Sequence, residues 1–306
     1  MNKNQDNIKG SIILIITAIL WGTTFVAQSL GSDYVGPFTY NACRFIITGI
    51  ILSLVSLIIS KNKKDEITKV ENRKSNLWII LMSIGVGVSL FFGATFQQIG
   101  IDMTKSASKS GFITTIYIVL VPVLGLLLKK KVKPHIWVCL FVALTGSYLI
   151  SIDGEFNIEI GDILTLICAL SFAAQIVIID IVNPHINSIK LSAIQFVIAG
   201  VLSFIIMIIT EGIDLNAIYH ALPAILYAAI FSGCIAFTLQ IIGQKYTEPT
   251  LASMIMSLEN VVALISGVII LHEQLTARTI IGCSLIFIAI IFAQLNIFNK
   301  KTKNIC

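Results

Sequence analysis

Ten long runs of apolar residues fill most of this chain of 306 residues. A membrane-spanning helix needs about 20 mostly apolar residues to cross a hydrocarbon core of about 30 Å, and each run is about that long. Strands of a membrane barrel would instead alternate polar and apolar residues over about 10 positions. The pattern predicts an all-α integral membrane protein with transmembrane helices near residues 11–30, 37–60, 77–99, 105–128, 135–152, 161–181, 188–210, 219–243, 249–271 and 278–298.

The composition supports this prediction and reduces the number of function classes that fit the chain. Only 12% of the residues are charged, 56% are hydrophobic, and the mean hydropathy is +0.93. The connections between runs are mostly short, so the chain has no room for a soluble catalytic domain. The six cysteines form no C-x-x-C pair and the four histidines show no ligand spacing. We therefore expect no metal, no cofactor and no enzyme activity.

The basic residues indicate the orientation. If the N-terminus lies inside, 17 of the 21 Lys and Arg residues fall in inner segments, and the outer side has only Lys105, Lys109 and Arg278. Such asymmetry sets topology in membranes, so we expect both termini in the cytoplasm. The net charge of +5 then follows from topology and requires no nucleic-acid partner.

The chain also resembles itself. Gly10, Ile12, Ala18, Phe45 and Gly49 recur 151 residues later as Gly161, Ile163, Ala169, Phe196 and Gly200, and Gln97, Gly100 and Thr104 recur 143 residues later as Gln240, Gly243 and Thr247. We expect two five-helix repeats, residues 1–152 and 153–306. Because five is odd, the second repeat starts on the opposite side of the membrane and is inverted. Inverted repeats recur in secondary transporters, which bind substrate near the midplane between the halves.

Several motifs resemble the EamA-type branch of the drug/metabolite transporter superfamily. They are WGTTF at 21–25, TKSASKSGFIT at 104–114, Gly161-Asp162, PTLAS at 249–253, SLE at 257–259 and EQLT at 273–276. The resemblance implies a ten-helix transporter of small polar or amphipathic metabolites, often an exporter. One position departs from the family, which usually has proline after SLE. Asn260 stands there and cannot impose the kink that proline imposes.

Glu259 is the first candidate functional residue. It lies near the middle of the run 249–271, where a carboxylate costs roughly 2.5–3.5 kcal/mol on insertion scales. Such a residue usually faces an internal cavity. It is a candidate for binding a proton or a substrate amine. The alternative is a structural carboxyl that ties helices together.

Three basic residues also fall in or beside the membrane. Arg44 shares a helix face with Asn41 and Thr48 at i, i+3 and i+7, and two interpretations are open: attraction of an anionic group, or a lipid-facing arginine. Lys105 and Lys109 begin the fourth run, where cations oppose the helix dipole. They either gate a substrate carboxylate or extend to lipid head groups.

Further polar and aromatic residues lie inside the runs. These are Trp21, Thr23, Thr24, Gln97, Thr114, Thr115, Tyr117, Gln175, Gln240 and Asn260. They either line a cavity or only hold helices together. We expect a central cavity lined mainly by the runs 11–30, 77–99, 105–128, 161–181, 219–243 and 249–271. Trp21 lies in the middle of its run, which favours a cavity or core position over an interfacial anchor.

The sequence thus predicts a secondary transporter of small metabolites such as amino acids, working by alternating access, with export as the expected direction and protons as a candidate coupling ion. A channel, sensor or assembly protein without carrier activity is the alternative, and an intramembrane enzyme a further one. No H-E-x-x-H, G-x-S-x-G or P-loop is present to support the enzyme. The expected partners are a small-molecule substrate, the lipid bilayer and protons, in a bacterial cell membrane. The sequence leaves monomer and homodimer open.

Overall fold

The computed structural model describes residues 3–62, 75–104, 107–152, 158–270 and 275–302. Within these ranges the chain forms helices and no strands. Ten helical stretches in the described residues are long enough and apolar enough to cross a membrane. They coincide with the ten predicted runs, so the predicted fold class is confirmed.

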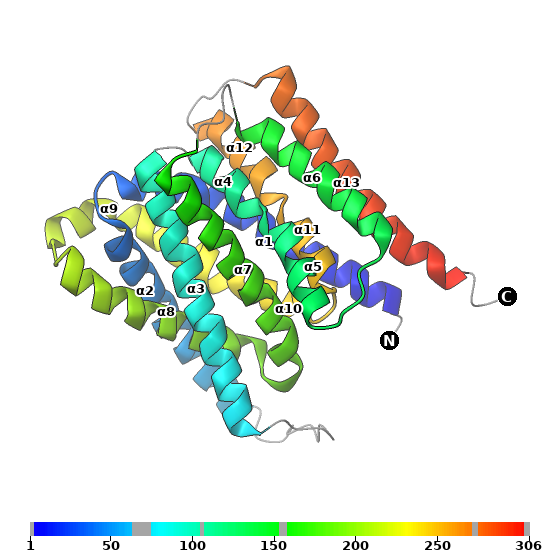
Figure 1. The fold of residues 1–306 in the computed structure, drawn as a ribbon. Helices are drawn as coiled ribbons and strands as arrows, with labels where there is room; N and C mark the ends of the chain where they lie inside the picture. The colour runs from blue at the N-terminus through cyan, green and yellow to red at the C-terminus, as the bar shows by residue number, and fades with distance from the viewer. Residues whose placement is uncertain (1–2, 63–74, 105–106, 153–157, 271–274, 303–306) are drawn as a thin grey trace.

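The first half contains α1 (Lys3–Ser32), α2 (Pro37–Asn62), α3 (Asn76–Thr104), α4 (Ala107–Thr115), α5 (Tyr117–Leu127) and α6 (Pro134–Ser151). The second half contains α7 (Ile160–Val182), η1 (Asn183–His185), α8 (Ser188–Thr210), α9 (Leu215–Tyr227), η2 (Ala228–Phe237), α10 (Thr238–Gln244), α11 (Pro249–Met256), α12 (Glu259–Ile270) and α13 (Ala277–Thr302). α1 begins and α13 ends at the same end of the bundle (Figure 1).

The two halves exchange their first helices. α1 packs mainly against α9, η2, α10, α11 and α12, which all belong to the second half. α7 packs mainly against α3, α4 and α5, which all belong to the first half. Equivalent helices also pair directly, α2 with α8 and α6 with α13, and the latter pair runs along one edge of the molecule (Figure 1). These reciprocal contacts, in which each helix and its equivalent pack in the same way, are expected of two related, inverted halves.

Glycines allow the closest of these crossings. A Cβ atom on Gly161 would collide with Thr104 of α3, and a Cβ atom on Gly100 would collide with Thr165 of α7. The hydroxyls of these threonines donate back to their own helices, Thr104 to the Gly100 carbonyl at 2.7 Å and Thr165 to the Gly161 carbonyl at 2.8 Å. The recurrence of Gly100 and Gly161 in the sequence repeat therefore has a packing cause.

A carboxylate also ties the halves together at one end of the bundle. Glu211, directly after α8, accepts hydrogen bonds from the backbone N–H groups of Phe38 and Thr39 at 3.0 and 2.7 Å. It also accepts one from the Thr39 hydroxyl at 2.6 Å. An acidic group at this position satisfies free N–H donors of α2 and complements its dipole.

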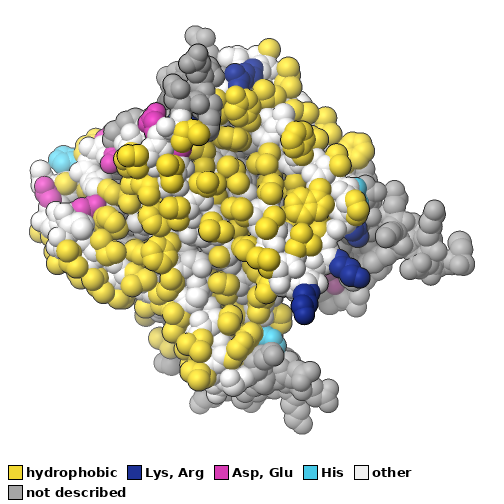
Figure 2. Space-filling model, in the orientation of Figure 1, with side chains coloured by type: hydrophobic (Ala, Val, Ile, Leu, Met, Phe, Trp, Pro, Cys, Tyr) yellow, Lys and Arg dark blue, Asp and Glu magenta, His cyan; other side chains and the backbone are white. Residues whose placement is uncertain are grey.

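The outer surface is apolar where a membrane protein needs it to be. Leu54, Phe141 and Ile209 are examples of large apolar residues that are mostly exposed within the spans. Figure 2 shows hydrophobic side chains across the middle of one face, with Lys, Arg, Asp and Glu towards its edges. In water such a surface would be unstable, whereas lipid chains solvate it at no cost.

The structure corrects the predicted helices in two ways. Helix α1 already begins at Lys3, although the first ten residues look like a polar tail. Three predicted spans are interrupted: 105–128 becomes α4 and α5, 249–271 becomes α11 and α12, and 219–243 contains the π-helix η2 between α9 and α10. Hydrophobic length sets the span, but it carries no information on a local change of hydrogen bonding within it.

Candidate functional site

A cavity lies between the exchanged helices in the interior of the bundle. It is lined by Trp21, Thr24, Phe25, Gln28, Arg44, Ala94, Gln97, Thr114, Tyr117, Phe172, Gln175, Ile176, Ser232, Phe237, Gln240 and Glu259. All six runs expected to line a cavity contribute residues, and α2 adds Arg44. The lining mixes aromatic rings, amides, hydroxyls, one basic side chain (Arg44) and one acidic side chain (Glu259).

Two of the three interrupted spans, α4–α5 and α11–α12, meet at this cavity. α4 ends at Thr115 and α5 begins at Tyr117, while α11 ends at Met256 and α12 begins at Glu259. The Tyr117 hydroxyl donates a hydrogen bond to Glu259 Oε1 at 3.2 Å, and both side chains are buried. The spans are the fourth of each half, and such paired interruptions mark the binding site in many inverted-repeat transporters.

The break before Glu259 forms without proline. Ser257 and Leu258 form a turn, in which the Ser257 hydroxyl donates to the Met254 carbonyl at 2.6 Å. Asn260 then donates through Nδ2 to Thr115 Oγ1 at 2.7 Å and to Ser147 Oγ at 3.2 Å. These bonds fix the start of α12 against α4 and α6. Asn260 thus holds helices together and does not line the cavity.

Arg44 is fully enclosed by protein, which rules out the lipid-facing interpretation. Its Nε donates to Asn41 Oδ1 at 2.9 Å, and its guanidinium lies over the rings of Phe45 and Tyr40, at 4.6 and 5.2 Å from the centroids. Among the residues that the structure describes, no carboxylate forms an ion pair with it. The rings and the amide stabilise the cation while its charge faces the cavity.

A network of amides holds one wall of the cavity in place. Gln28 Nε2 donates to Gln97 Oε1 at 3.2 Å and to Gln98 Oε1 at 3.1 Å. Gln97 Nε2 donates to Thr114 Oγ1 at 3.3 Å. Buried amides that pair in this way link α1, α3 and α4 at low energetic cost.

The two halves of the sequence contribute residues from matching repeat positions to the cavity. We call two residues repeat equivalents when 151 residues separate them in the first part of each half, or 143 in the later part. The lining contains five such pairs: Trp21 with Phe172, Thr24 with Gln175, Phe25 with Ile176, Ala94 with Phe237, and Gln97 with Gln240. The same helix faces of both halves therefore point at one internal space.

Nine of the predicted residues line the cavity: Glu259, Arg44, Trp21, Thr24, Gln97, Thr114, Tyr117, Gln175 and Gln240. Thr23, Thr115 and Asn260, which were also candidates, do not line it. Sequence reasoning missed Phe25, Gln28, Ala94, Phe172, Ile176, Ser232 and Phe237. Most of these are apolar and look like any membrane-facing residue. The sequence did hold a signal for Phe172, because it is the repeat equivalent of the predicted residue Trp21. Ile176 and Phe237 are equivalents of Phe25 and Ala94, which were missed as well.

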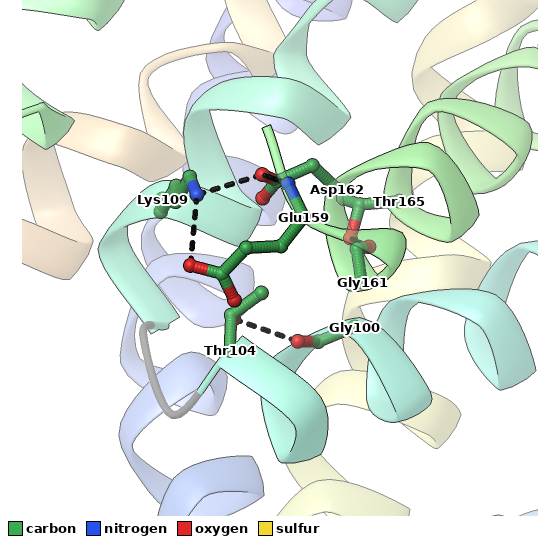
Figure 3. Close-up of polar contacts among 7 residues, drawn as sticks. All are labelled: Gly100, Thr104, Lys109, Glu159, Gly161, Asp162 and Thr165. Atoms are coloured by element: carbon green, nitrogen blue, oxygen red, sulfur yellow. Dashed lines mark hydrogen bonds and ion pairs between the residues drawn. The ribbon is translucent and has the colours of Figure 1, made fainter. Parts of the chain in front are cut away.

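Lys109 lies away from the cavity and does not extend to lipid head groups. Its Nζ lies 2.7 Å from Asp162 Oδ2 and 3.7 Å from Glu159 Oε1 (Figure 3). Asp162 also accepts the backbone N–H of Glu159 at 2.8 Å, which closes the first turn of α7. The carboxylates explain why a cation is stable at the start of α4. Lys105 and residues 273–274 of the EQLT motif lie outside the described residues.

Inverted five-helix halves around a polar internal cavity define a class of membrane transporter. A model of the EamA-like transporter family matches residues 8–152 and 159–295, and the chain belongs to this family. An uncharacterized transporter of Archaeoglobus fulgidus is 32% identical over 93% of this chain and 85% of its own length. The uncharacterized transporter YoaV of Bacillus subtilis is 25% identical over 96% of this chain and 99% of its own length.

A solved crystal structure shares the fold. It superposes with a TM-score of 0.75 at 19% identity and covers 94% of this chain and 96% of its own. At this identity the similarity concerns the fold alone. An Escherichia coli relative, the uncharacterized inner membrane transporter YedA, is 22% identical over 90% of this chain and 88% of its own length.

Proposed function

We propose that this protein is a secondary carrier of small zwitterionic metabolites such as amino acids. One observation carries the proposal: a single cavity holds the buried guanidinium of Arg44 and the buried carboxyl of Glu259. A guanidinium binds a carboxylate well, and a carboxylate binds an ammonium group. A zwitterion brings both groups, and its apolar part finds the rings of Trp21, Phe172 and Phe237.

Glu259 also links transport to protons in this proposal. Its carboxyl is buried at the break between α11 and α12, within hydrogen-bonding distance of the Tyr117 hydroxyl. A group at such a break contacts water on one side of the membrane or the other as the surrounding helices rock. A proton or a substrate ammonium group then occupies the carboxyl in turn, so that a proton gradient drives substrate movement.

The bodies that rock each contain helices of both sequence halves, 1–152 and 153–306. α7 moves with α3, α4 and α5, and α1 moves with α9 to α12, because these are the groups that pack together. We place both termini in the cytoplasm of a bacterial cell, with the chain in its cell membrane and export as the direction. The basic inner segments support the orientation, and YedA of E. coli is itself an inner membrane transporter.

Reconstitution tests the carrier function. Purified protein in liposomes loaded with a mixture of unlabelled amino acids is expected to take up labelled amino acid from outside by counterflow. A carrier exchanges substrate without net flux, whereas a channel only dissipates gradients. Empty liposomes and liposomes loaded with glucose serve as controls. The absence of counterflow for every amino acid tested would exclude this substrate class.

A further inference from the structure

The two repeat-equivalent glutamines of the cavity differ in one respect. Gln97 of α3 is bonded at both ends, since Oε1 accepts from Gln28 and Nε2 donates to Thr114. Gln240 of α10 is fully buried, yet neither Oε1 nor Nε2 has a hydrogen-bond partner within the described protein. The same residue type at the same position of each half is therefore hydrogen-bonded in the first half and without a partner in the described part of the second.

An unpaired buried amide is costly. Leaving a buried donor or acceptor without a partner costs about 1–3 kcal/mol, and such groups are rare in native proteins. The indole Nε1–H of Trp21, which lines the same cavity, also has no hydrogen-bond partner in the part of the chain that the structure describes. Gln240 and Trp21 both line the cavity that also holds Arg44 and Glu259, so their polar groups lie in the wall of that space.

We infer that Gln240, together with Trp21 Nε1–H, binds an uncharged polar group on the substrate, whereas Gln97 is a structural residue. The inference rests on the proposed function. It divides the substrate into three parts: a carboxylate at Arg44, an ammonium group at Glu259, and a hydroxyl, amide or carbonyl at Gln240. The amide of Gln240 both donates and accepts, so it suits a group that does the same. The preferred substrates are then small zwitterions with a polar side chain.

The first test needs no ligand. Thermal unfolding of the purified full chain in nanodiscs is measured for Gln97→Met and Gln240→Met, which keep the length of the side chain. Gln97→Met removes the hydrogen bonds that join Gln97 to Gln28 and to Thr114, and it is expected to lower the midpoint by at least about 2 °C. Gln240→Met removes no side-chain hydrogen bond found among the described residues, and it is expected to leave the midpoint unchanged or to raise it. An equal loss in both variants would show that Gln240 is structural and would overturn the inference.

The second test uses near-isosteric pairs of amino acids, threonine with valine and glutamine with methionine. Wild-type protein is expected to bind the polar member more tightly, by about three- to tenfold, the worth of one uncharged hydrogen bond. In Gln240→Met this preference is expected to fall towards one, while the apolar members bind as before. An unchanged preference would overturn the inference. If no amino acid binds wild-type protein, the proposed substrate class is wrong, and the unfolding comparison still decides whether Gln240 is structural.

Discussion

At the residue scale, the molecule places its few intramembrane charges where protein surrounds them. Arg44 is stabilised by rings and an amide, and Glu259 by the hydroxyl of Tyr117. Each remains without an ion-pair partner among the described residues. Isolated charges in a membrane interior are expensive and usually functional, so these two are the natural targets for mutation.

Substitution of Glu259 by Gln separates the roles of this carboxyl. Glu259→Gln keeps the shape and removes the ability to exchange a proton. If Glu259 couples protons, the variant is expected to perform counterflow but to lose accumulation driven by a pH gradient in proteoliposomes. If it binds the substrate ammonium group, counterflow itself is expected to fall by tenfold or more. A tenfold loss corresponds to about 1.4 kcal/mol of binding free energy.

The control for this experiment is Asp33→Asn, which changes an exposed carboxylate outside the cavity. It is expected to transport like wild type. Wild-type transport by Glu259→Gln, from mildly acid to mildly alkaline pH, would mean that this carboxyl serves only to hold α5 and α12 together.

At the element scale, the interrupted spans α4–α5 and α11–α12 differ in the ion pairs that join them to their neighbours. The span α4–α5 is joined to α7 near both ends, by Lys109 with Asp162 and by Lys130 with Asp180. The repeat equivalents of Lys109 and Asp162 are Ala252 and Ser11, which carry no charge. The contact between α11 and α1 therefore lacks the ion pair that fastens α4 to α7. An internal repeat conserves helix packing, but it does not oblige the charges to match.

The burial of these ion pairs predicts unequal energies. The side chain of Lys109 is 15% exposed and that of Asp162 is 6% exposed, whereas Lys130 is 43% exposed. Lys109→Met leaves a buried carboxylate unpaired and is expected to lower the free energy of unfolding by about 2–4 kcal/mol. Lys130→Met breaks a more exposed pair and is expected to cost only about 0.2–1 kcal/mol.

Denaturant unfolding in mixed micelles measures both variants. The single variant Asp162→Asn and the double variant Lys109→Met/Asp162→Asn complete a double-mutant cycle. The double variant is expected to recover part of the loss, since no buried charge then lacks a partner. Equal costs for the two lysine variants would contradict the burial argument.

At the scale of the whole molecule, the described connections allow a direct test of the orientation. Lys131 and Ile213 are exposed in the connections after α5 and α8, on opposite sides of the membrane in the proposed topology. In a background without native cysteines, Ile213→Cys is expected to react with a membrane-impermeant maleimide from outside intact cells. Lys131→Cys is expected to react only after the membrane is opened. The reverse pattern would invert the proposed topology, and equal labelling of both would refute the odd number of spans between them.

The sequence by itself determined the membrane location, the number of spans and most polar residues of the cavity. Hydrophobic length alone sets the spans, because a backbone in lipid must satisfy its own hydrogen bonds and therefore stays helical. Polar residues such as Gln97, Gln175 and Glu259 stand out because burial in lipid is costly for them. Their presence in the sequence already indicated an internal space, although not which of them meet.

Only the tertiary structure decided the rest. Apolar lining residues such as Phe25 and Ile176 differ from lipid-facing ones only in the direction of their side chains, which depends on packing. The exchange of α1 and α7 between halves is also a packing outcome, fixed by close glycine crossings far apart in the chain. The break before Glu259 arises at Ser257–Leu258, where the sequence has no proline that would predict it. Finally, the pairing of Gln97 and the isolation of Gln240 depend on neighbours from other helices, which a local pattern does not contain.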